Sequence, residues 1–386
     1  MNRRHLTSLL ALLVPRTTLA GSEAWEGSVT LGSPHLADRV ALDAAGYAIT
    51  DNATHGAARL SRRYGVVVAQ AGTAVNRLWP DKTISYCFET VEARDRLQDY
   101  VHRAVALWAE NGLNSLVYKY TQVTEPGSGC VNHAQRDRLL VISFNTQGVM
   151  STTNGMAALD PSKPSYKGPV MALSDRSDIG TLDPLTNIAH EIGHAWGLLH
   201  EHQNPNFWVK VQGDDGVGGP QSPFRDDNFD CTALKDYQEK ALQGHDMFLL
   251  CSNYMAASTY RFSASEWLPI PEHLANWEMT GERLTDNDVD WNSIMLYPSG
   301  AGGTGTAAPP AAGQPLDAND HRQPVLLKRD GSRIKPNYAP SPRDIEGIRW
   351  LYDDSSFSEG LPVLISDKSN SKFDKFRNLF KKNKGC

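Results

Sequence analysis

Hydrophobic and polar positions along the chain follow two different periods, which together predict a protein with both helices and strands. Segment 78–90 (LWPDKTISYCFET) is rich in β-branched and aromatic residues after a Pro-Asp pair, which is typical of a strand. Segments 116–123 and 137–146 have the same character. Residues 93–111 instead place apolar side chains at helical spacing, at Leu97, Val101, Ala104, Val105 and Trp108.

A second helix is predicted over residues 184–196. Asp183 suits the N-cap, and Pro184 suits the first turn because proline has no N–H that would stay unpaired. At about 100° per residue, His190 and His194 lie one turn apart on the same face. The opposite face is apolar, with Leu185, Ile188, Ile192, Ala195 and Trp196. One face can therefore pack into a core while the other offers two imidazoles to one point.

The residues after this helix supply a third imidazole. Gly197 can take the left-handed conformation that ends a helix and turns the chain back, so that His200 follows on the returning segment. Three neutral imidazoles with a fourth position left for water indicate a catalytic zinc site rather than a structural one. Glu191 lies beside the helix histidines, where it can accept a proton from the bound water. His202, two positions beyond His200, is interpreted as a residue that does not bind the metal.

The full spacing His-Glu-x-x-His-x-x-Gly-x-x-His, over residues 190–200, is far more specific than His-Glu-x-x-His alone. The structural alternative is an exposed helix with coincidental histidines. Such a helix would not need so sharp a division between a polar and an apolar face, and the pattern therefore favours the metal site.

Beyond the histidines the periodicity weakens. Residues 206–290 form a long polar stretch, and residues 298–315 (PSGAGGTGTAAPPAAGQP) have the composition of a flexible loop. Residues 341–352 predict a closing helix, with Ile345, Ile348 and Leu351 at three-residue steps. The tail, residues 353–386, is polar and then basic, which indicates a solvated segment; a basic amphipathic anchor is the alternative.

The composition places the chain of 386 residues, 40% hydrophobic and 21% charged, among soluble globular proteins. Its net charge of −6 argues against a general nucleic-acid or membrane-surface binder. Residues 1–20 have the basic start, apolar run and small residues of a secretory signal peptide. Residues 21–77 are either a pro-segment, cleaved after the basic pair that ends at Arg63, or a loosely ordered N-terminal extension.

Five cysteines are an odd number, and in a secreted chain this predicts two disulfides and one free thiol. Cys87 and Cys130 flank the first helix, whereas Cys231 and Cys251 lie in one polar segment. We expect these two pairs, with Cys386 free.

The motif HEIGHAWGLLH with the later SIMLY, residues 293–297, resembles the metzincin metallopeptidases, in which a methionine-containing turn lies beneath the zinc histidines. Glu201 directly after the third histidine, and a tyrosine two positions after Met295, resemble the astacin branch. The resemblance implies an astacin-like α+β catalytic domain over residues 78–352. It would have a mixed upper sheet with two long helices, an irregular lower subdomain, and zinc in the cleft between them.

The resemblance also implies a role for each residue of the motif. The zinc ligands would be His190, His194 and His200. Glu191 would be the general base, and Tyr297 a further zinc ligand that swings away to stabilise the oxyanion. Structural support would come from Gly197, Glu201 and Met295.

We therefore predict a secreted, monomeric endopeptidase with one catalytic Zn²⁺ that hydrolyses proteins or peptides by zinc-bound water, with neither a nucleic-acid nor a membrane partner. One alternative is a non-catalytic, zinc-folded binding or adhesion module, in which Glu191 would have no evident purpose. The other is a metzincin peptidase of another branch, which Glu201 and Tyr297 together disfavour.

Overall fold

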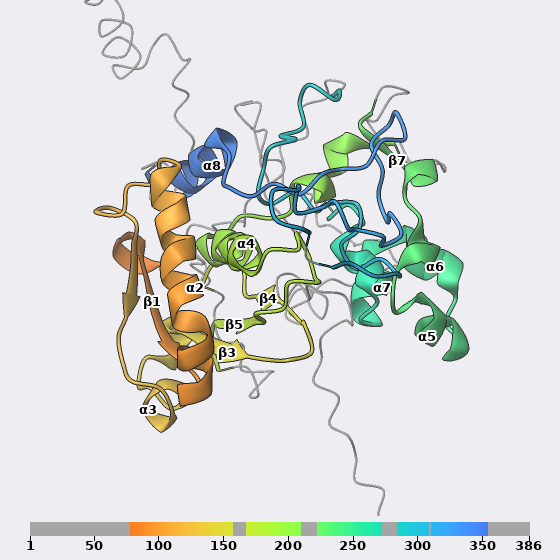
Figure 1. Ribbon diagram of the computed structural model, residues 1–386. Coiled ribbons are helices and arrows are strands. Elements are labelled where there is room, and N and C mark those ends of the chain that lie inside the picture. Colours follow the sequence, from red (N-terminus) through yellow and green to blue (C-terminus); the bar gives the residue numbers. More distant parts are fainter. Residues whose placement is uncertain (1–77, 157–166, 210–221, 272–283, 309, 354–386) are drawn as a thin grey trace, which may run out of the picture.

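The computed structural model describes residues 78–156, 167–209, 222–271, 284–308 and 310–353 (Figure 1). The strands are β1 (Thr83–Phe88), β2 (Lys119–Gln122), β3 (Leu140–Phe144), β4 (Ser151–Thr152), β5 (Val170–Leu173), β6 (Trp208–Val209) and β7 (Phe224–Arg225). The helices are α2 (Val91–Glu110), α3 (Ser128–Val131), α4 (Pro184–Trp196), α5 (Tyr237–Leu242), α6 (Met247–Ser252), α7 (Tyr254–Thr259) and α8 (Pro342–Asp353). The predicted signal segment 1–20, the segment 21–77, and the tail from residue 354 to Cys386 lie outside these residues.

Five strands form one mixed sheet in the order β2-β1-β3-β5-β4. Neighbours pair in parallel except at the edge, where β4 runs antiparallel to β5. The mixed sheet is as predicted, but β1 and β3 are shorter than the segments assigned to them. Short 3-10 turns, Pro80–Lys82 and Arg136–Arg138, occupy the starts of those segments. Asp81 has a φ of 51°, a left-handed backbone that cannot continue a strand.

The two longest helices pack against each other and against the sheet (Figure 1). α4 spans the residues predicted for it, because the side chain of Asp183 accepts a hydrogen bond from the N–H of Thr186 and so caps the first turn. Two buried indoles contribute to its position. Trp108 of α2 donates from Nε1 to the carbonyl of Ala189 at 2.8 Å, and Trp79 donates to that of Ala195 at 2.7 Å.

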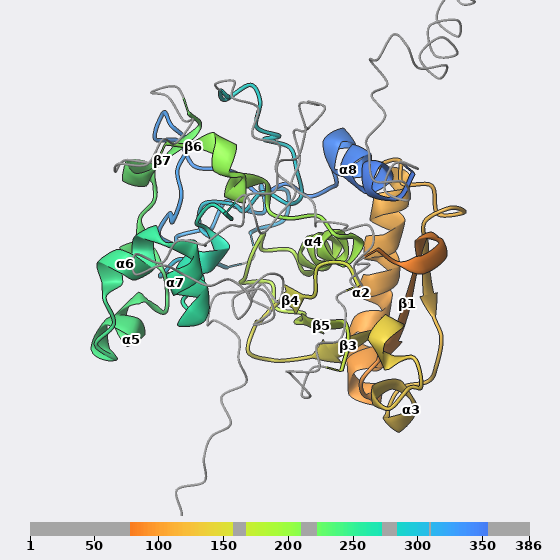
Figure 2. The same cartoon turned by 180° about the vertical axis from the view of Figure 1, so that it is seen from behind.

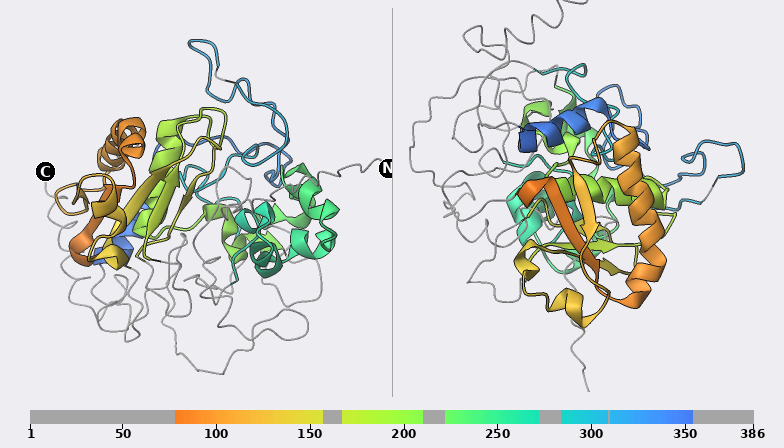
Figure 3. Two further views of the ribbon diagram at one scale, coloured as in Figure 1. Left: turned by 90° about the horizontal axis from the view of Figure 1, so that it is seen from below. Right: turned by 90° about the vertical axis from the view of Figure 1, so that its left-hand side faces the viewer.

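The chain after α4 contains little regular structure among its described residues. Helices α5, α6 and α7 lie on the side of the molecule opposite α2 and β1 (Figures 2 and 3). The predicted closing helix is present as α8, which returns to the N-terminal part of the chain. Arg349 donates to the carbonyl of Gly112 at 2.6 Å, and the hydroxyl of Tyr118 donates to Asp353 at 2.6 Å.

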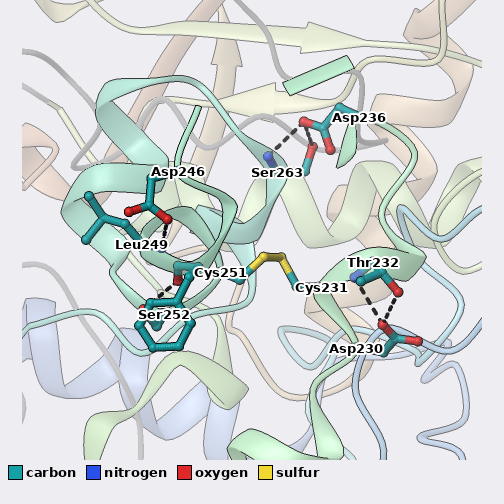
Figure 4. Close-up of a disulfide and its surroundings, with 10 residues drawn as sticks. Asp230, Cys231, Thr232, Asp236, Asp246, Leu249, Cys251, Ser252 and Ser263 are labelled. Carbon is teal, nitrogen blue, oxygen red and sulfur yellow. Dashed lines mark hydrogen bonds between the residues drawn. A yellow bond between two sulfur atoms is a disulfide. The ribbon is translucent and has the colours of Figure 1, made fainter. Parts of the chain in front are cut away.

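Two disulfides confirm the expected pairing. Cys87 in β1 is bonded to Cys130 in α3, and Cys231 is bonded to Cys251 in α6 (Figure 4). Disulfides of this kind persist in oxidising compartments. Within the described residues, no helix combines the length and the apolar character that a bilayer crossing requires.

Candidate metal centre

The described residues contain one group of side chains arranged as metal ligands: His190, His194 and His200. All three are buried, between 1% and 3% exposed. Nε2 of His194 lies 3.1 Å from Nε2 of His190 and 3.0 Å from Nε2 of His200. The structure thus brings the three predicted ligands to one point.

The end of α4 explains how the third histidine reaches this point. Gly197 has φ 105° and ψ 14°, the left-handed conformation that glycine adopts without a steric penalty. Its N–H donates to the carbonyl of His194, and the N–H of Leu198 donates to that of Gly193 at 3.0 Å. These bonds close the helix, and the chain turns so that His200 faces α4.

Each imidazole has its outer nitrogen bonded to an oxygen atom. Nδ1 of His190 is 2.6 Å from the carbonyl of Ile294, and Nδ1 of His194 is 2.8 Å from that of Leu198. Nδ1 of His200 is 2.7 Å from Oε1 of Gln203. Because these oxygens only accept hydrogen bonds, Nδ1 carries the proton in each neutral ring, and the Nε2 lone pairs face one another.

Three lone pairs that meet in a buried space repel one another unless a cation lies between them. A set of three neutral imidazole nitrogens with hydrogen-bonded outer nitrogens is the donor set of catalytic zinc sites. The residues present therefore fit a zinc ion.

Glu191 lies on the helix that carries two of these histidines, and the methionine-containing turn packs against that helix. Glu191 is fully buried in α4 between the two helix ligands in sequence. Met295 packs beneath α4 so closely that a Cβ on Gly193 would lie 2.4 Å from its Sδ. The carbonyl of Met295 accepts a hydrogen bond from the N–H of Glu201 at 3.0 Å. The turn is thereby bonded to the segment that carries His200, as well as packed against α4.

Tyr297 belongs to an aromatic cluster around the third ligand. Its ring centroid lies 4.3 Å from that of His200 and 4.8 Å from that of His202. The imidazole of His202 stacks on His200 at 5.3 Å, and its Nε2 lies 2.8 Å from the carbonyl of Glu266. His202 does not belong to the set of three converging histidines; its ring packs beside His200 and Tyr297.

Two buried carboxyl groups, those of Glu201 and Asp344, accept hydrogen bonds from the residues in and just before the methionine-containing turn. Burial raises the pKa of Glu201 well above its usual range, and Oε1 of Glu201 accepts the N–H of Asp290 at 2.9 Å. Burial also raises the pKa of Asp344 in α8 to about 6. The Asp344 carboxyl accepts the hydroxyl of Ser293 at 2.6 Å and the N–H of Ile294 at 2.9 Å. Asp344 thus holds the residue whose carbonyl orients His190.

No sequence pattern assigned a role to Gln203 or Asp344. Gln203 bonds residues 62 and 65 positions away, and Asp344 bonds residues 51 and 50 positions away. The spacing of apolar and polar residues within one helix or strand cannot predict contacts between residues so far apart in the sequence. The only local signal was the position of Gln203, three residues after a predicted ligand.

No protein-family model matches the chain, and no curated protein sequence matches it. Among solved structures, the chain is similar to the crystal structure of myroilysin, with 16% sequence identity and a TM-score of 0.36. The similarity covers 72% of this chain and 86% of that one.

Proposed function

We propose that this protein is a secreted zinc-dependent endopeptidase of the astacin-like type. The observation that carries the proposal is the convergence of three buried Nε2 atoms, two of them from the helix that also carries the buried Glu191. When bound, zinc lowers the pKa of water to about 7 and polarises the carbonyl of the scissile bond.

The chain's own residues perform the proton transfers and the orientation. Glu191 would accept the proton of the attacking water and then deliver it to the leaving amine. Nδ1 hydrogen bonds hold the three imidazoles in one tautomer, so that their basic nitrogens stay directed at the metal. Tyr297, whose ring packs on His200, would stabilise the oxyanion.

The first test separates metal binding from catalysis. Glu191→Gln should retain one zinc per chain and lose cleavage of a peptide library by about 10²- to 10⁴-fold, because the general base is removed. His194→Ala should lose zinc and cleavage together. Glu239→Gln changes an exposed carboxyl on α5 and is the matched control.

Two outcomes would contradict the proposal in different ways. If Glu191→Gln holds zinc and still cleaves, the base is another group. If the wild-type protein binds zinc but cleaves no protein or peptide, with or without a chelator, the chain is a zinc-folded binding module.

The assignment to the astacin-like branch depends on Tyr297. Tyr297→Phe should keep the zinc content and the KM while lowering kcat by roughly 10²-fold, the usual effect of removing one oxyanion donor. An unchanged kcat would point to a peptidase of another branch.

Secretion is supported by the two disulfides. N-terminal sequencing of the exported protein should show removal of residues 1–20. A start immediately after Arg63 would identify residues 21–63 as a pro-segment, whereas a start at Gly21 would identify an extension.

A further inference from the structure

The third histidine of the centre is held differently from the other two. His190 and His194 each donate from Nδ1 to a backbone carbonyl. His200 donates from Nδ1 to a side chain, the amide oxygen of Gln203, at 2.7 Å. A backbone carbonyl persists through substitution, but a side chain can be exchanged. Substitution of Gln203 can therefore remove the hydrogen bond to His200 while all three histidines remain.

The amide of Gln203 is fixed in one orientation by a distant part of the chain. Gln203 is only 2% exposed, and its Nε2 donates to the carbonyls of Ser265 at 2.8 Å and Leu268 at 2.9 Å. Both amide hydrogens therefore meet oxygen atoms. The opposite orientation would place Oε1 against these two carbonyl oxygens, and His200 would lose its acceptor.

The segment that holds Gln203, residues 263–270, is bonded in turn to the disulfide-containing region. Asp236, which lies between Cys231 and Cys251 in sequence, accepts the N–H of Ser263 at 2.8 Å and its hydroxyl at 2.7 Å (Figure 4). The N–H of Ile270 donates to the carbonyl of Gln203 at 2.9 Å. A continuous set of contacts thus connects Asp236, residues 263–270, Gln203 and His200.

We propose that Gln203 is a positioning residue for His200, and that residues 263–270 set the zinc affinity of the centre through it. The proposal rests on the zinc site of the proposed function. While Nδ1 of His200 donates to Gln203, the ring cannot rotate and Nε2 keeps its lone pair for the metal. A merely structural glutamine would stabilise residues 263–270 without affecting metal binding.

Gln203→Met tests this role, because methionine keeps the unbranched shape and removes the acceptor. The zinc dissociation constant, measured by competition with a chromogenic chelator, should rise about 10- to 100-fold. The visible spectrum of the Co²⁺-substituted protein should change, because His200 no longer has a fixed orientation. Gln243→Met replaces an exposed glutamine at the end of α5 and should change neither quantity.

Gln203→Glu separates the two functions of the side chain. Its carboxylate still accepts from Nδ1 of His200, but its second oxygen cannot donate to the carbonyls of Ser265 and Leu268 and faces them as an unpaired acceptor. Zinc affinity should stay within about threefold of the wild-type value, since the hydrogen bond to the ligand is kept. The midpoint of thermal unfolding should fall, because two buried carbonyls lose their donors.

A folded Gln203→Met protein with wild-type zinc affinity and an unchanged Co²⁺ spectrum would overturn the proposal. If that variant does not fold, Gln203→Asn decides, because its shorter side chain cannot bring the amide oxygen to Nδ1 of His200. A zinc dissociation constant raised about 10-fold or more supports the proposal, and a wild-type value contradicts it. These measurements read zinc binding alone, so a wild-type protein that binds zinc and cleaves nothing would refute the peptidase without affecting this test.

Discussion

The described residues of the N-terminal part, 78–196, and of the C-terminal part, 198–353, contribute to the same candidate metal centre by different means. In the N-terminal part, repeated hydrogen bonds in the sheet and in α2 and α4 satisfy the backbone, and apolar side chains at regular spacing fill the core. In the C-terminal part, single polar side chains bond the backbone. Asn337 donates to the carbonyls of Trp291 and Ser293, and Ser299 donates to that of Leu326.

This difference indicates which substitutions should disturb the placement of the three histidines most. His190 and His194 are placed by a helix whose position depends on many contacts, so the loss of one contact is shared among the rest. His200 and the turn around Ile294 depend on individual partners, Gln203 and Asp344. We therefore expect substitutions in the C-terminal part to affect metal binding more than equally destabilising substitutions in the N-terminal part.

The largest effect should come from removing the disulfides one at a time. Loss of Cys231–Cys251 or Cys87–Cys130 by paired Cys→Ser changes should each lower the free energy of unfolding by about 2–4 kcal/mol in urea titrations. Zinc affinity should fall only when Cys231–Cys251 is lost, because that bond supports the segment that orients Gln203. Equal zinc affinities in the two variants would contradict the expectation that metal binding depends more on the C-terminal part than on the N-terminal part.

Asp344→Asn tests the buried carboxyl beneath the turn. Burial raises the pKa of Asp344 to about 6, although hydrogen bonds from Ser293, Ser341 and Ile294 oppose the shift. A carboxyl whose pKa is higher in the folded state stabilises the fold fully below about pH 4, and this contribution is lost as the pH rises through about 6. The stability advantage of the wild type over the variant should therefore shrink by on the order of 2 kcal/mol between about pH 4 and pH 7.

The measurement for Asp344 is urea unfolding at a series of pH values, with Asp286→Asn, an exposed carboxyl, as the control. A difference between wild type and Asp344→Asn that stays constant with pH would contradict the role given to this carboxyl.

Gly193→Ala tests the contact between the two parts. The added Cβ would lie 2.4 Å from Sδ of Met295 and 3.2 Å from the ring of Trp108, so both side chains must move. The expected loss is about 1–2 kcal/mol, at the lower end for overpacking because methionine adapts to new shapes. Gly129→Ala, which meets only an ordinary contact at 3.4 Å, is the control. Thermal unfolding of both variants would reveal the difference, and equal midpoints would argue against tight packing here.

The smallest effect should come from the surface of the N-terminal part. Arg103 and Asp99 face each other one turn apart on α2 at 3.5 Å, and both side chains are exposed. Arg103→Ala should therefore change the free energy of unfolding by less than about 0.5 kcal/mol and leave zinc affinity unchanged. A measurable fall in zinc affinity would mean that metal binding is as sensitive to substitutions in the N-terminal part as to substitutions in the C-terminal part.

The sequence predicted the elements whose causes are local. Helix α4 begins and ends where its capping residue, its proline and Gly197 indicate, and α2 and α8 follow their apolar spacing. Strand β4 has two residues, and α5, α6 and α7 have six each, which is too short for a period to be read. The disulfide pairs were predicted because Cys87 and Cys130 flank the first helix, whereas Cys231 and Cys251 lie in one polar segment.

By itself, the sequence determined the metal-ligand pattern, since the spacing of His190, Glu191, His194, Gly197 and His200 depends only on helix geometry and on one glycine. His194 bonds the carbonyl of Leu198, only four residues along the chain. For His190 and His200, only the tertiary structure decided which oxygen atom holds the imidazole. Their partners, Ile294 and Gln203, are themselves held by residues 50 or more positions away. Contacts at that separation form only after the chain has folded, and they leave no period in the sequence.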